Sequence, residues 1–206
     1  MLEIWGRTNS INVQKVMWTV GEIGLAHVRH DAGGAYGVVD TEDYAALNPN
    51  RLVPTIRDGD VVLWESHVIV RYLAAKYDDG GLWPTDPAVR ANADRWMDWT
   101  ASTLNAPMRT VFWGLIRTPV EQRDDAAIKA GVIALGRAFI LLDAALEGRD
   151  HVAGERLTMG DIPVGCATYR YFGLDIKRPD LPNVETWYAG LAERPAFREH
   201  VMLPLT

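Results

Sequence analysis

The sequence predicts an α/β domain followed by an all-α domain built as a helical bundle, and three observations predict this order. Strand-like runs alternate with helical patterns over residues 1–78. Residues 79–86 are rich in Gly, Pro and Asp, a composition typical of a linker. From residue 87 onward the regular pattern is helical. We therefore expect domains at residues 1–78 and 87–206, joined by a linker at residues 79–86.

The first elements are a strand at residues 2–5, a polar loop and a helix. Apolar residues recur at helical spacing over residues 13–20 and define one face of that helix. Ser10 and Asn12 are both candidates for its N-cap, because their side chains accept hydrogen bonds from backbone amides. Gly24 is expected to end the helix, because glycine readily adopts left-handed backbone.

The rest of the first domain alternates short strands and helices. We expect a strand at residues 27–31, a short helix at 41–47, strands at 53–57 and 61–64, and a helix at 66–77. Asp58 and Gly59 form a strong hairpin signal, so the strands on either side of them are expected to pair in antiparallel fashion. Pro54 cannot donate a backbone hydrogen bond, so it belongs at a sheet edge, a strand start or a cis turn.

Helical periodicity organises the second domain. A helix is expected to start near Pro87 and to run until Pro107 kinks or ends it. A second helix is expected to begin near Pro119, with apolar residues recurring every three or four positions from Ile128 to Leu146. This stripe predicts a long buried helix face. A coiled coil is the alternative, but the sustained heptads it requires are missing.

Composition and charge exclude several classes of function. The chain has 21 Lys and Arg against 27 Asp and Glu, a formal net charge of −6, so nucleic acid is not an expected partner. No stretch approaches the roughly 20 apolar residues that cross a bilayer, and the first residues hold no signal-peptide core, so a cytoplasmic protein without a membrane partner is expected. Cys166, the single cysteine, allows no internal dithiol pair and fits a reducing compartment. No residues are assigned to a metal.

Three segments carry motifs at characteristic spacing. They are Asn48–Pro54 with Asp58–Asp60 and Glu65–Leu73, then Leu157–Pro163, and finally Leu181–Phe197. Together they resemble the glutathione transferase family over nearly the whole chain. The resemblance implies a thioredoxin-like fold for the α/β domain and a cytoplasmic homodimeric enzyme of detoxification that uses glutathione as co-substrate. Trp64 and His67 are candidate dimer contacts.

One of these segments resembles the helix-capping segment that the family has in its helical domain. The resemblance implies that the Thr158 hydroxyl accepts a hydrogen bond from the backbone amide of Asp161. The Asp161 carboxylate would then return a bond to the segment before the helix. We interpret this pair as structural.

The helix that Glu65 and Ser66 open predicts an anion site. Free backbone amides and the positive end of the helix dipole favour a carboxylate there, and the Ser66 hydroxyl adds a donor. The resemblance implies that this carboxylate is that of the γ-glutamyl group of glutathione, with Glu65 facing its ammonium group. It also implies that Val53, before a cis Pro54, pairs its backbone with the cysteinyl part, and that Arg51 reaches the glycyl carboxylate. Simple helix capping by Ser66 and an ordinary edge proline are the structural alternatives.

The group that stabilises the glutathione thiolate is expected near the start of the first helix. In the family this group is Tyr, Ser or Cys, and here the earliest tyrosine is Tyr36 while the cysteine lies in the helical domain. Thr8, Asn9, Ser10 and Asn12 remain. The run from Ser10 to Val16 resembles a pattern of bacterial members that makes Ser10 the hydroxyl donor and Asn12 a second, amide donor. Helix capping alone is the structural alternative for both residues.

The second substrate has no fixed motif. Met108, Arg109, Phe112 and Trp113 are candidate pocket residues, although aromatic residues at helical spacing are more often core. We expect conjugation of the glutathione thiolate to a small hydrophobic electrophile. A glutathione-dependent disulfide reductase, and a non-catalytic binding or interaction module of the same fold, are the alternatives.

Overall fold

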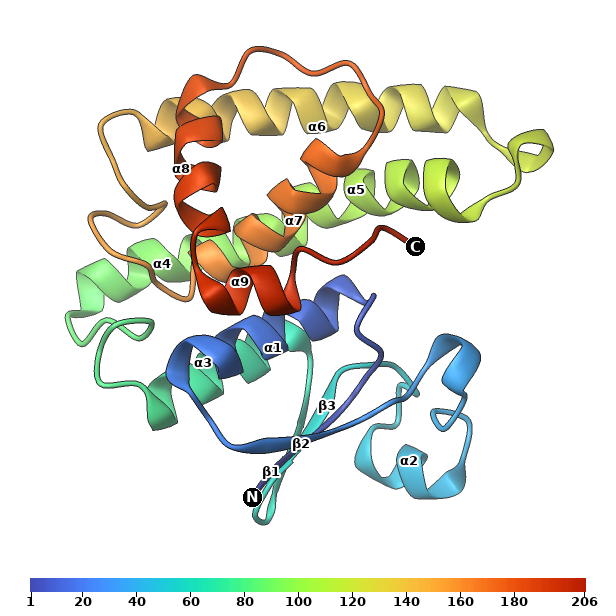
Figure 1. The fold of residues 1–206 in the computed structure, drawn as a ribbon, viewed down its shortest axis with the longest axis vertical. Helices are drawn as coiled ribbons and strands as arrows, with labels where there is room; N and C mark the ends of the chain where they lie inside the picture. The colour runs from blue at the N-terminus through green and yellow to red at the C-terminus, as the bar shows by residue number, and fades with distance from the viewer. The chain divides into compact units, whose positions relative to one another are not determined.

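A computed structural model describes residues 1–206 (Figure 1), and the chain divides into two compact units. The first comprises Met1–Trp83 together with Pro195–Leu203, and the second comprises Pro84–Arg194 with Pro204–Thr206. An α/β unit and a helical unit confirm the predicted fold class. The division differs from the expected boundaries in assigning Pro195–Leu203 to the first unit. The proposed domains at 1–78 and 87–206 therefore stay a prediction.

The first unit is built on a four-stranded sheet with the order β2-β1-β3-β4. Its strands are β1 (Leu2–Trp5), β2 (His27–His30), β3 (Thr55–Asp58) and β4 (Val61–Trp64). β1 and β2 run parallel, and β1 and β3 run antiparallel. β3 and β4 are also antiparallel, as the Asp58-Gly59 turn predicts. Because parallel neighbours need a crossover, helix α1 (Ile11–Ile23) connects β1 to β2.

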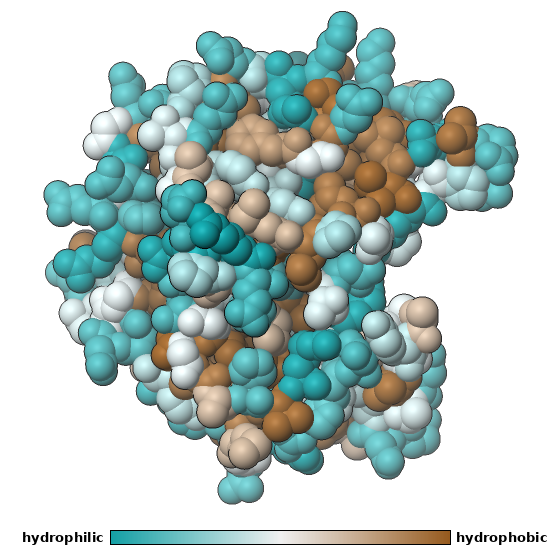
Figure 2. Space-filling model, viewed as in Figure 1, coloured by the Kyte–Doolittle hydropathy of each residue, from teal (hydrophilic) through white to brown (hydrophobic).

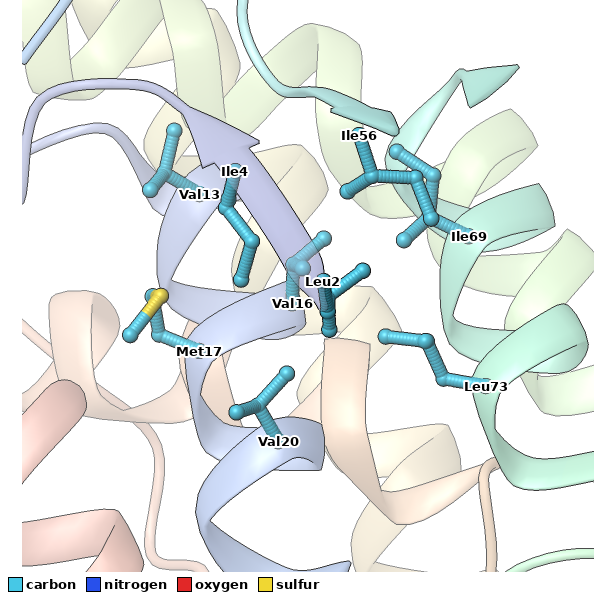
Figure 3. Close-up of a cluster of buried hydrophobic side chains, with 9 residues drawn as sticks. All are labelled: Leu2, Ile4, Val13, Val16, Met17, Val20, Ile56, Ile69 and Leu73. Carbon is cyan, nitrogen blue, oxygen red and sulfur yellow. The ribbon is translucent and has the colours of Figure 1, made fainter. Parts of the chain in front are cut away.

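The core of this unit lies between the sheet and the helices α1 and α3 (Ser66–Tyr77). Alternate residues of β1 point into it, while α1 and α3 each contribute a row of apolar side chains (Figure 3). The cluster consists of Leu2, Ile4, Val13, Val16, Met17, Val20, Ile56, Ile69 and Leu73. Helix α9 (Pro195–His200) packs on α1, where Phe197 meets the Trp18 ring edge-on at 4.7 Å between centroids.

Element boundaries in this unit follow the predicted signals closely. Ser10 is the N-cap of α1, and Gly24 ends it with φ = 71°. Helix α2 (Glu42–Leu47) is capped by Thr41, and the turn η1 (Gly34–Tyr36) precedes it. β3 begins two residues later than expected, because proline has no backbone N–H for the sheet. The Val53–Pro54 peptide is cis.

Asp58 fastens the β3–β4 hairpin to the end of α3. Its carboxylate accepts hydrogen bonds from Tyr72 (2.8 Å), from Tyr77 (2.7 Å) and from Nζ of Lys76 (2.7 Å). Burial raises the pKa of Asp58, but the hydrogen bonds from Lys76, Tyr77 and Tyr72 outweigh it and hold the pKa below its ordinary value. The carboxylate therefore stays charged and bound at neutral pH.

The second unit is helical throughout. Its elements are α4 (Pro87–Trp99), η2 (Thr100–Leu104), α5 (Asn105–Phe112), η3 (Trp113–Arg117), η4 (Val120–Gln122), α6 (Asp125–Leu146), α7 (Asp161–Gly173) and α8 (Pro182–Ala192). None of the helices is both long and apolar enough to cross a lipid bilayer. On the face in Figure 2, hydrophobic residues gather over the last part of α5 and the first part of α6.

Two expectations for this unit concern prolines. Pro107 does not end a helix, since it lies in the first turn of α5, but the alternative expectation of a kink agrees with the π-helical segment η2 just before it. The next helix does not begin near Pro119 either. Asp124 caps α6 by accepting a hydrogen bond from the Ala127 amide at 2.9 Å, and the polar residues before it form only the turn η4.

The buried Asp161 carboxylate organises the start of α7. It accepts hydrogen bonds from the amides of Val152 and Thr158, from the Thr158 hydroxyl and from Nε1 of Trp187, at 2.9–3.1 Å. The predicted return bond from Asp161 is thus present. The expected role of the Thr158 hydroxyl is wrong: it donates to the carboxylate, and the Asp161 amide instead bonds to the Thr158 carbonyl.

Candidate functional site

A shallow pocket of about 50 Å³ lies in the first unit, where three segments meet. They are the start of α1, the segment before β3, and the junction between β4 and α3. The lining includes five residues that the sequence singled out, namely Asn12, Val53, Pro54, Glu65 and Ser66. The pocket holds only part of a peptide-sized ligand, so a larger ligand must extend across the surface beside it.

The start of α3 presents hydrogen-bond donors to this pocket. The first backbone bond of the helix runs from the Ile69 amide to the Glu65 carbonyl, so the amides before Ile69 have no partner within the helix. Ser66 is only 6% exposed, and the Glu65 side chain makes no capping bond. Such a helix end favours an anion through both its amides and its dipole.

Glu65 adopts backbone angles that non-glycine residues rarely adopt. Its φ is 71° and its ψ is 109°, a conformation that costs of order 1–3 kcal/mol. This backbone conformation turns the chain between β4 and α3, and Glu65 and Ser66 both line the pocket. Strained positions of this kind concentrate at ligand sites.

Val53 offers an unused strand edge. Its backbone forms no hydrogen bond within the protein, and the sheet ladder begins two residues later, at Thr55. An extended peptide can pair with such a backbone as an added strand.

Asn48 holds this segment in place and was not among the predicted site residues. Its Nδ2 donates to the Leu52 carbonyl (2.9 Å) and to Oγ1 of Thr55 (3.0 Å), and its Oδ1 accepts from the Asn50 amide. The hydroxyl of Tyr44 also donates to the Leu52 carbonyl, at 2.6 Å. Burial raises the pKa of Tyr44, so the hydroxyl keeps its proton for this bond.

Four lining residues were missed as site residues: Asn48, Asn50, Leu52 and Trp64. Their signal was present in the motif from Asn48 to Pro54, but spacing alone does not separate a residue that touches a ligand from one that supports the chain around it.

Ser10 leaves its hydroxyl uncommitted at the start of α1. The residue is 8% exposed and caps the helix with its backbone carbonyl, which accepts from the Gln14 amide at 2.9 Å, but its side chain makes no capping bond. The expected alternative that the Ser10 side chain only caps the helix is therefore not observed. Asn12 lies inside the helix and lines the pocket, whereas Ser10 is not among the lining residues.

Lys15 connects the two helix starts. Its side chain is almost completely buried, at 1% exposure. Nζ donates to Oδ1 of Asn12 at 3.0 Å and lies 3.0 Å from Nε2 of His67, the second residue of α3. Asn12 on α1 and the start of α3 are thus held by one side chain.

Arg51 does not join this group. It has φ = 54°, and its guanidinium donates to Glu42 at 2.8 Å and to the Thr41 carbonyl at 3.3 Å. In this arrangement it supports the start of α2 rather than lining the pocket.

The residues predicted for the second substrate divide into core and surface within the helical unit. Met108 and Phe112 are buried, at 4% and 1% exposure, and the Arg170 guanidinium lies 4.0 Å from the centre of the Phe112 ring. Trp113 is 46% exposed, and the Arg109 guanidinium lies 5.3 Å from its ring. Of these residues, Trp113 and Arg109 are the ones that a ligand can reach without repacking.

The comparisons with known proteins agree across the whole chain. Residues 9–76 match the family model "Glutathione S-transferase, N-terminal domain", and residues 104–195 match "Glutathione S-transferase, C-terminal domain". The chain is 43% identical to "Glutathione S-transferase GstB" of Escherichia coli (strain K12), with all of both chains covered.

Solved structures give the same picture. A theta class glutathione S-transferase from Xanthomonas axonopodis pv. citri, solved with glutathione bound, is 49% identical, with a TM-score of 0.96 over 100% of this chain and 99% of that one. A delta-class glutathione transferase from Nilaparvata lugens is 25% identical, with a TM-score of 0.86 over 97% of this chain and 92% of that one.

Proposed function

Since the chain belongs to the glutathione S-transferase family, we propose that it conjugates the thiolate of glutathione to a small hydrophobic electrophile. The protein is a glutathione transferase, and glutathione is its co-substrate. The observation that carries the proposal is the pocket where the free helix start at Ser66 faces the unused backbone of Val53.

The start of α3 binds the γ-glutamyl end of glutathione in this proposal. The amides of the first turn and the Ser66 hydroxyl donate to the carboxylate, and the helix dipole adds about 0.3–1 kcal/mol. The Glu65 carboxylate accepts from the ammonium group. The strained backbone of Glu65 supports this role, because it brings a negative side chain and a positive helix end into one small pocket.

The backbone of Val53 pairs with the cysteinyl residue of glutathione. The N–H and C=O of Val53 form no hydrogen bond within the protein, so both are available to an added strand. Arg51 would have to leave Glu42 to reach the glycyl carboxylate, so we assign it the weakest contribution of the proposed residues.

Ser10 stabilises the thiolate, with Asn12 as a second donor. Lowering a thiol pKa from about 8.5 by two units takes about 2.7 kcal/mol. One hydrogen bond to a charged sulfur contributes about 1.5–3 kcal/mol, and a helix start adds about 0.3–1 kcal/mol. The free hydroxyl at the start of α1 is therefore sufficient for the ionisation, and positioning of the electrophile supplies the remaining rate.

The electrophile is expected to contact the exposed part of the predicted set, Trp113 and Arg109, with Met108 and Phe112 forming the core behind them. Homodimer formation, a role in detoxification and action in the cytoplasm are further parts of the proposal. Of the two candidate dimer contacts, Trp64 is 39% exposed, whereas His67 is half-buried and lies 3.0 Å from Nζ of Lys15.

Disulfide reduction is the second candidate. The single cysteine, Cys166, is buried in α7 and supplies no reactive thiol, so both thiols would have to come from glutathione. A disulfide-exchange rate no higher than the uncatalysed background would exclude it. Failure to bind glutathione at millimolar concentration would instead favour a non-catalytic module.

The decisive experiment compares the wild type with Ser10→Ala while glutathione is titrated and thiolate absorbance is followed as the pH is varied. We expect the bound thiol of the wild type to ionise well below its free pKa. In Ser10→Ala the thiol pKa should rise by one to two units and turnover at neutral pH should fall by up to about 30-fold, with glutathione affinity little changed. An unchanged thiol pKa in the variant would move the role to Thr8, Asn9 or Asn12.

A further inference from the structure

One arginine of the first unit has no partner for its charge. Arg7 follows β1 and is half-buried, yet its guanidinium forms no hydrogen bond or ion pair within the protein. Three other arginines of this unit each bind a carboxylate at 2.6–2.8 Å, namely Arg29 to Asp31, Arg51 to Glu42 and Arg57 to Glu3. A half-buried cation loses hydration without gaining an anion, so the guanidinium of Arg7 is left for a charged ligand.

Two glycines make room for this side chain beside the candidate site. A Cβ added to Gly33 would lie 3.2 Å from Nη1 of Arg7 and 3.3 Å from Cγ1 of Val53, so the two side chains meet at this glycine. A Cβ added to Gly34 would lie 3.2 Å from Cδ of Arg7. Both glycines have positive φ, 78° and 61°, which other residues rarely adopt. The turn after β2 thus lets Arg7 lie next to the residue that we assign to the cysteinyl part of glutathione.

Arg7 also lies in the same turn as the hydroxyl that we assign to the thiolate. Its carbonyl accepts a hydrogen bond from the Ser10 amide at 3.3 Å, and its amide donates to the Ala32 carbonyl at 3.0 Å. Arg7 is not among the residues that line the pocket at Ser66, where the glutamyl part is placed. In the proposed arrangement its charge therefore neighbours the reacting sulfur and not the glutamyl carboxylate.

We propose that Arg7 binds a carboxylate of the second substrate, so that the protein conjugates glutathione to small electrophiles that carry a negative charge. This inference rests on the proposed function and narrows its substrate class. A guanidinium holds a carboxylate through two parallel hydrogen bonds and stays protonated in proteins. It also offsets the repulsion between a thiolate and an anionic electrophile, which otherwise opposes their approach.

The role of Arg7 in the reaction is to orient the electrophile. The thiolate sulfur attacks the electrophilic carbon, the C–S bond forms, and the leaving group departs with the electron pair of its bond. Arg7 exchanges no proton in this step, and its contribution is the positioning that brings the reacting atoms together. The glycyl carboxylate of glutathione is the other carboxylate that this residue could bind, and the test separates the two.

The test compares a charged electrophile with its neutral amide, 4-chloro-3-nitrobenzoate with 4-chloro-3-nitrobenzamide. Attack at the carbon that carries chlorine forms an aryl thioether and releases chloride, and absorbance follows the thioether at varied glutathione. Arg7→Met removes the cation, and Arg7→Lys keeps the charge without the paired hydrogen bonds. Arg137→Met, at an exposed arginine of α6, removes the same charge elsewhere and is the control variant.

We expect Arg7→Met to lower kcat/KM for the benzoate about ten-fold or more and to leave kcat/KM for the benzamide unchanged. Arg7→Lys should keep part of the benzoate activity, and Arg137→Met should behave as the wild type with both compounds. Activity with the benzamide also shows that the variants are folded.

Three results would overturn the inference and leave the proposed function standing. They are an unchanged benzoate rate in Arg7→Met, an equal loss with both electrophiles, and a raised KM for glutathione, which would assign Arg7 to the glycyl carboxylate. A wild type that accelerates neither compound would contradict the proposed function together with the inference.

A binding measurement tests the contact without turnover. 3-Nitrobenzoate has no leaving group at the reacting position, so it can be titrated calorimetrically into the wild type with saturating glutathione. We expect it to bind more tightly than 3-nitrobenzamide, and we expect this difference to disappear in Arg7→Met. Equal affinities of the two compounds for the wild type would overturn the inference.

Discussion

The helices α4 and α6 begin with a carboxylate bound to backbone amides, whereas α1 and α3 begin with side chains that make no such bond. Asp86 accepts from the Ala88 and Val89 amides, both at 2.9 Å, and Asp124 accepts from the Ala127 amide. Ser10 and Glu65 hold the equivalent positions of α1 and α3 without a side-chain bond. The difference teaches that α4 and α6 use their first amides for stability, while the first amides of α1 and α3 are left without a capping side chain, as the proposed ligand site requires.

Asp161 is a helix-start carboxylate with four hydrogen bonds to buried groups, more than Asp86 or Asp124 has. Asp161→Ala leaves the amides of Val152 and Thr158 and Nε1 of Trp187 buried without an acceptor. We expect the free energy of unfolding to fall by about 3 kcal/mol or more, measured by urea denaturation. The variant that still folds should bind glutathione as before. A loss below about 1 kcal/mol would show that these groups find water or other partners.

Ser66 is the helix-start residue to which we assign a role in binding glutathione. Ser66→Ala removes a hydroxyl donor to a carboxylate, a bond worth about 1.5–3 kcal/mol, so glutathione affinity should fall about ten-fold or more while urea stability changes little. Calorimetric titration with glutathione measures the affinity. If Ser66→Ala lowers the urea stability but leaves glutathione affinity unchanged, then Ser66 is a structural helix cap like Asp86. The proposed contrast between the helix starts would then be wrong for α3.

Asp58 adds a pH test of a structural carboxylate. The Asp58 pKa lies below its ordinary value, so its contribution to stability is complete above the unfolded pKa of about 3.9 and is lost as the pH falls through the lower folded value. At pH 7, Asp58→Asn should be less stable than the wild type by about 1–3 kcal/mol. This difference should shrink as the pH falls below about 4, which denaturant melts at several pH values measure. A constant difference would show that shape rather than charge holds the hairpin.

Asp86→Ala is expected to have the smallest effect. It removes one cap from the exposed start of α4 and should cost about 1 kcal/mol of stability, with glutathione affinity and turnover unchanged. It is the matched partner of Ser66→Ala, because each variant removes one side chain at a helix start. A changed affinity in Asp86→Ala would mean that the two kinds of helix start are coupled.

Local signals were enough to predict most of the first unit. The hairpin at Asp58-Gly59, the helix from Ser66 to Tyr77 and the stop at Gly24 each depend on a few adjacent residues, and all three are confirmed. In the helical unit, the start of α6 was expected near Pro119, but the helix begins after Asp124. The Asp124 carboxylate accepts a hydrogen bond from an amide of the first turn, whereas Pro119 precedes only the short turn η4.

The sequence predicted which motif residues belong to the candidate site, but not the contacts that hold them in place. Glu65, Ser66, Val53 and Asn12 meet in one pocket as the resemblance implies, but their roles toward glutathione remain predictions. The supporting contacts of Asn48 were not predictable, because they depend on where the Leu52 carbonyl and Thr55 lie in space. For the same reason, the sequence did not separate buried Phe112 from exposed Trp113.

Lys15 gives the proposed site a fixed dimension. Its buried ammonium contacts Asn12 on α1 and His67 on α3, so one side chain ties the helix that would hold the thiol to the helix that would hold the carboxylate. If glutathione binds as proposed, this fixed spacing would select thiol substrates by their length. A tripeptide whose thiol arm is one methylene longer would still fasten by its carboxylate, yet its sulfur would overshoot the hydroxyl of Ser10.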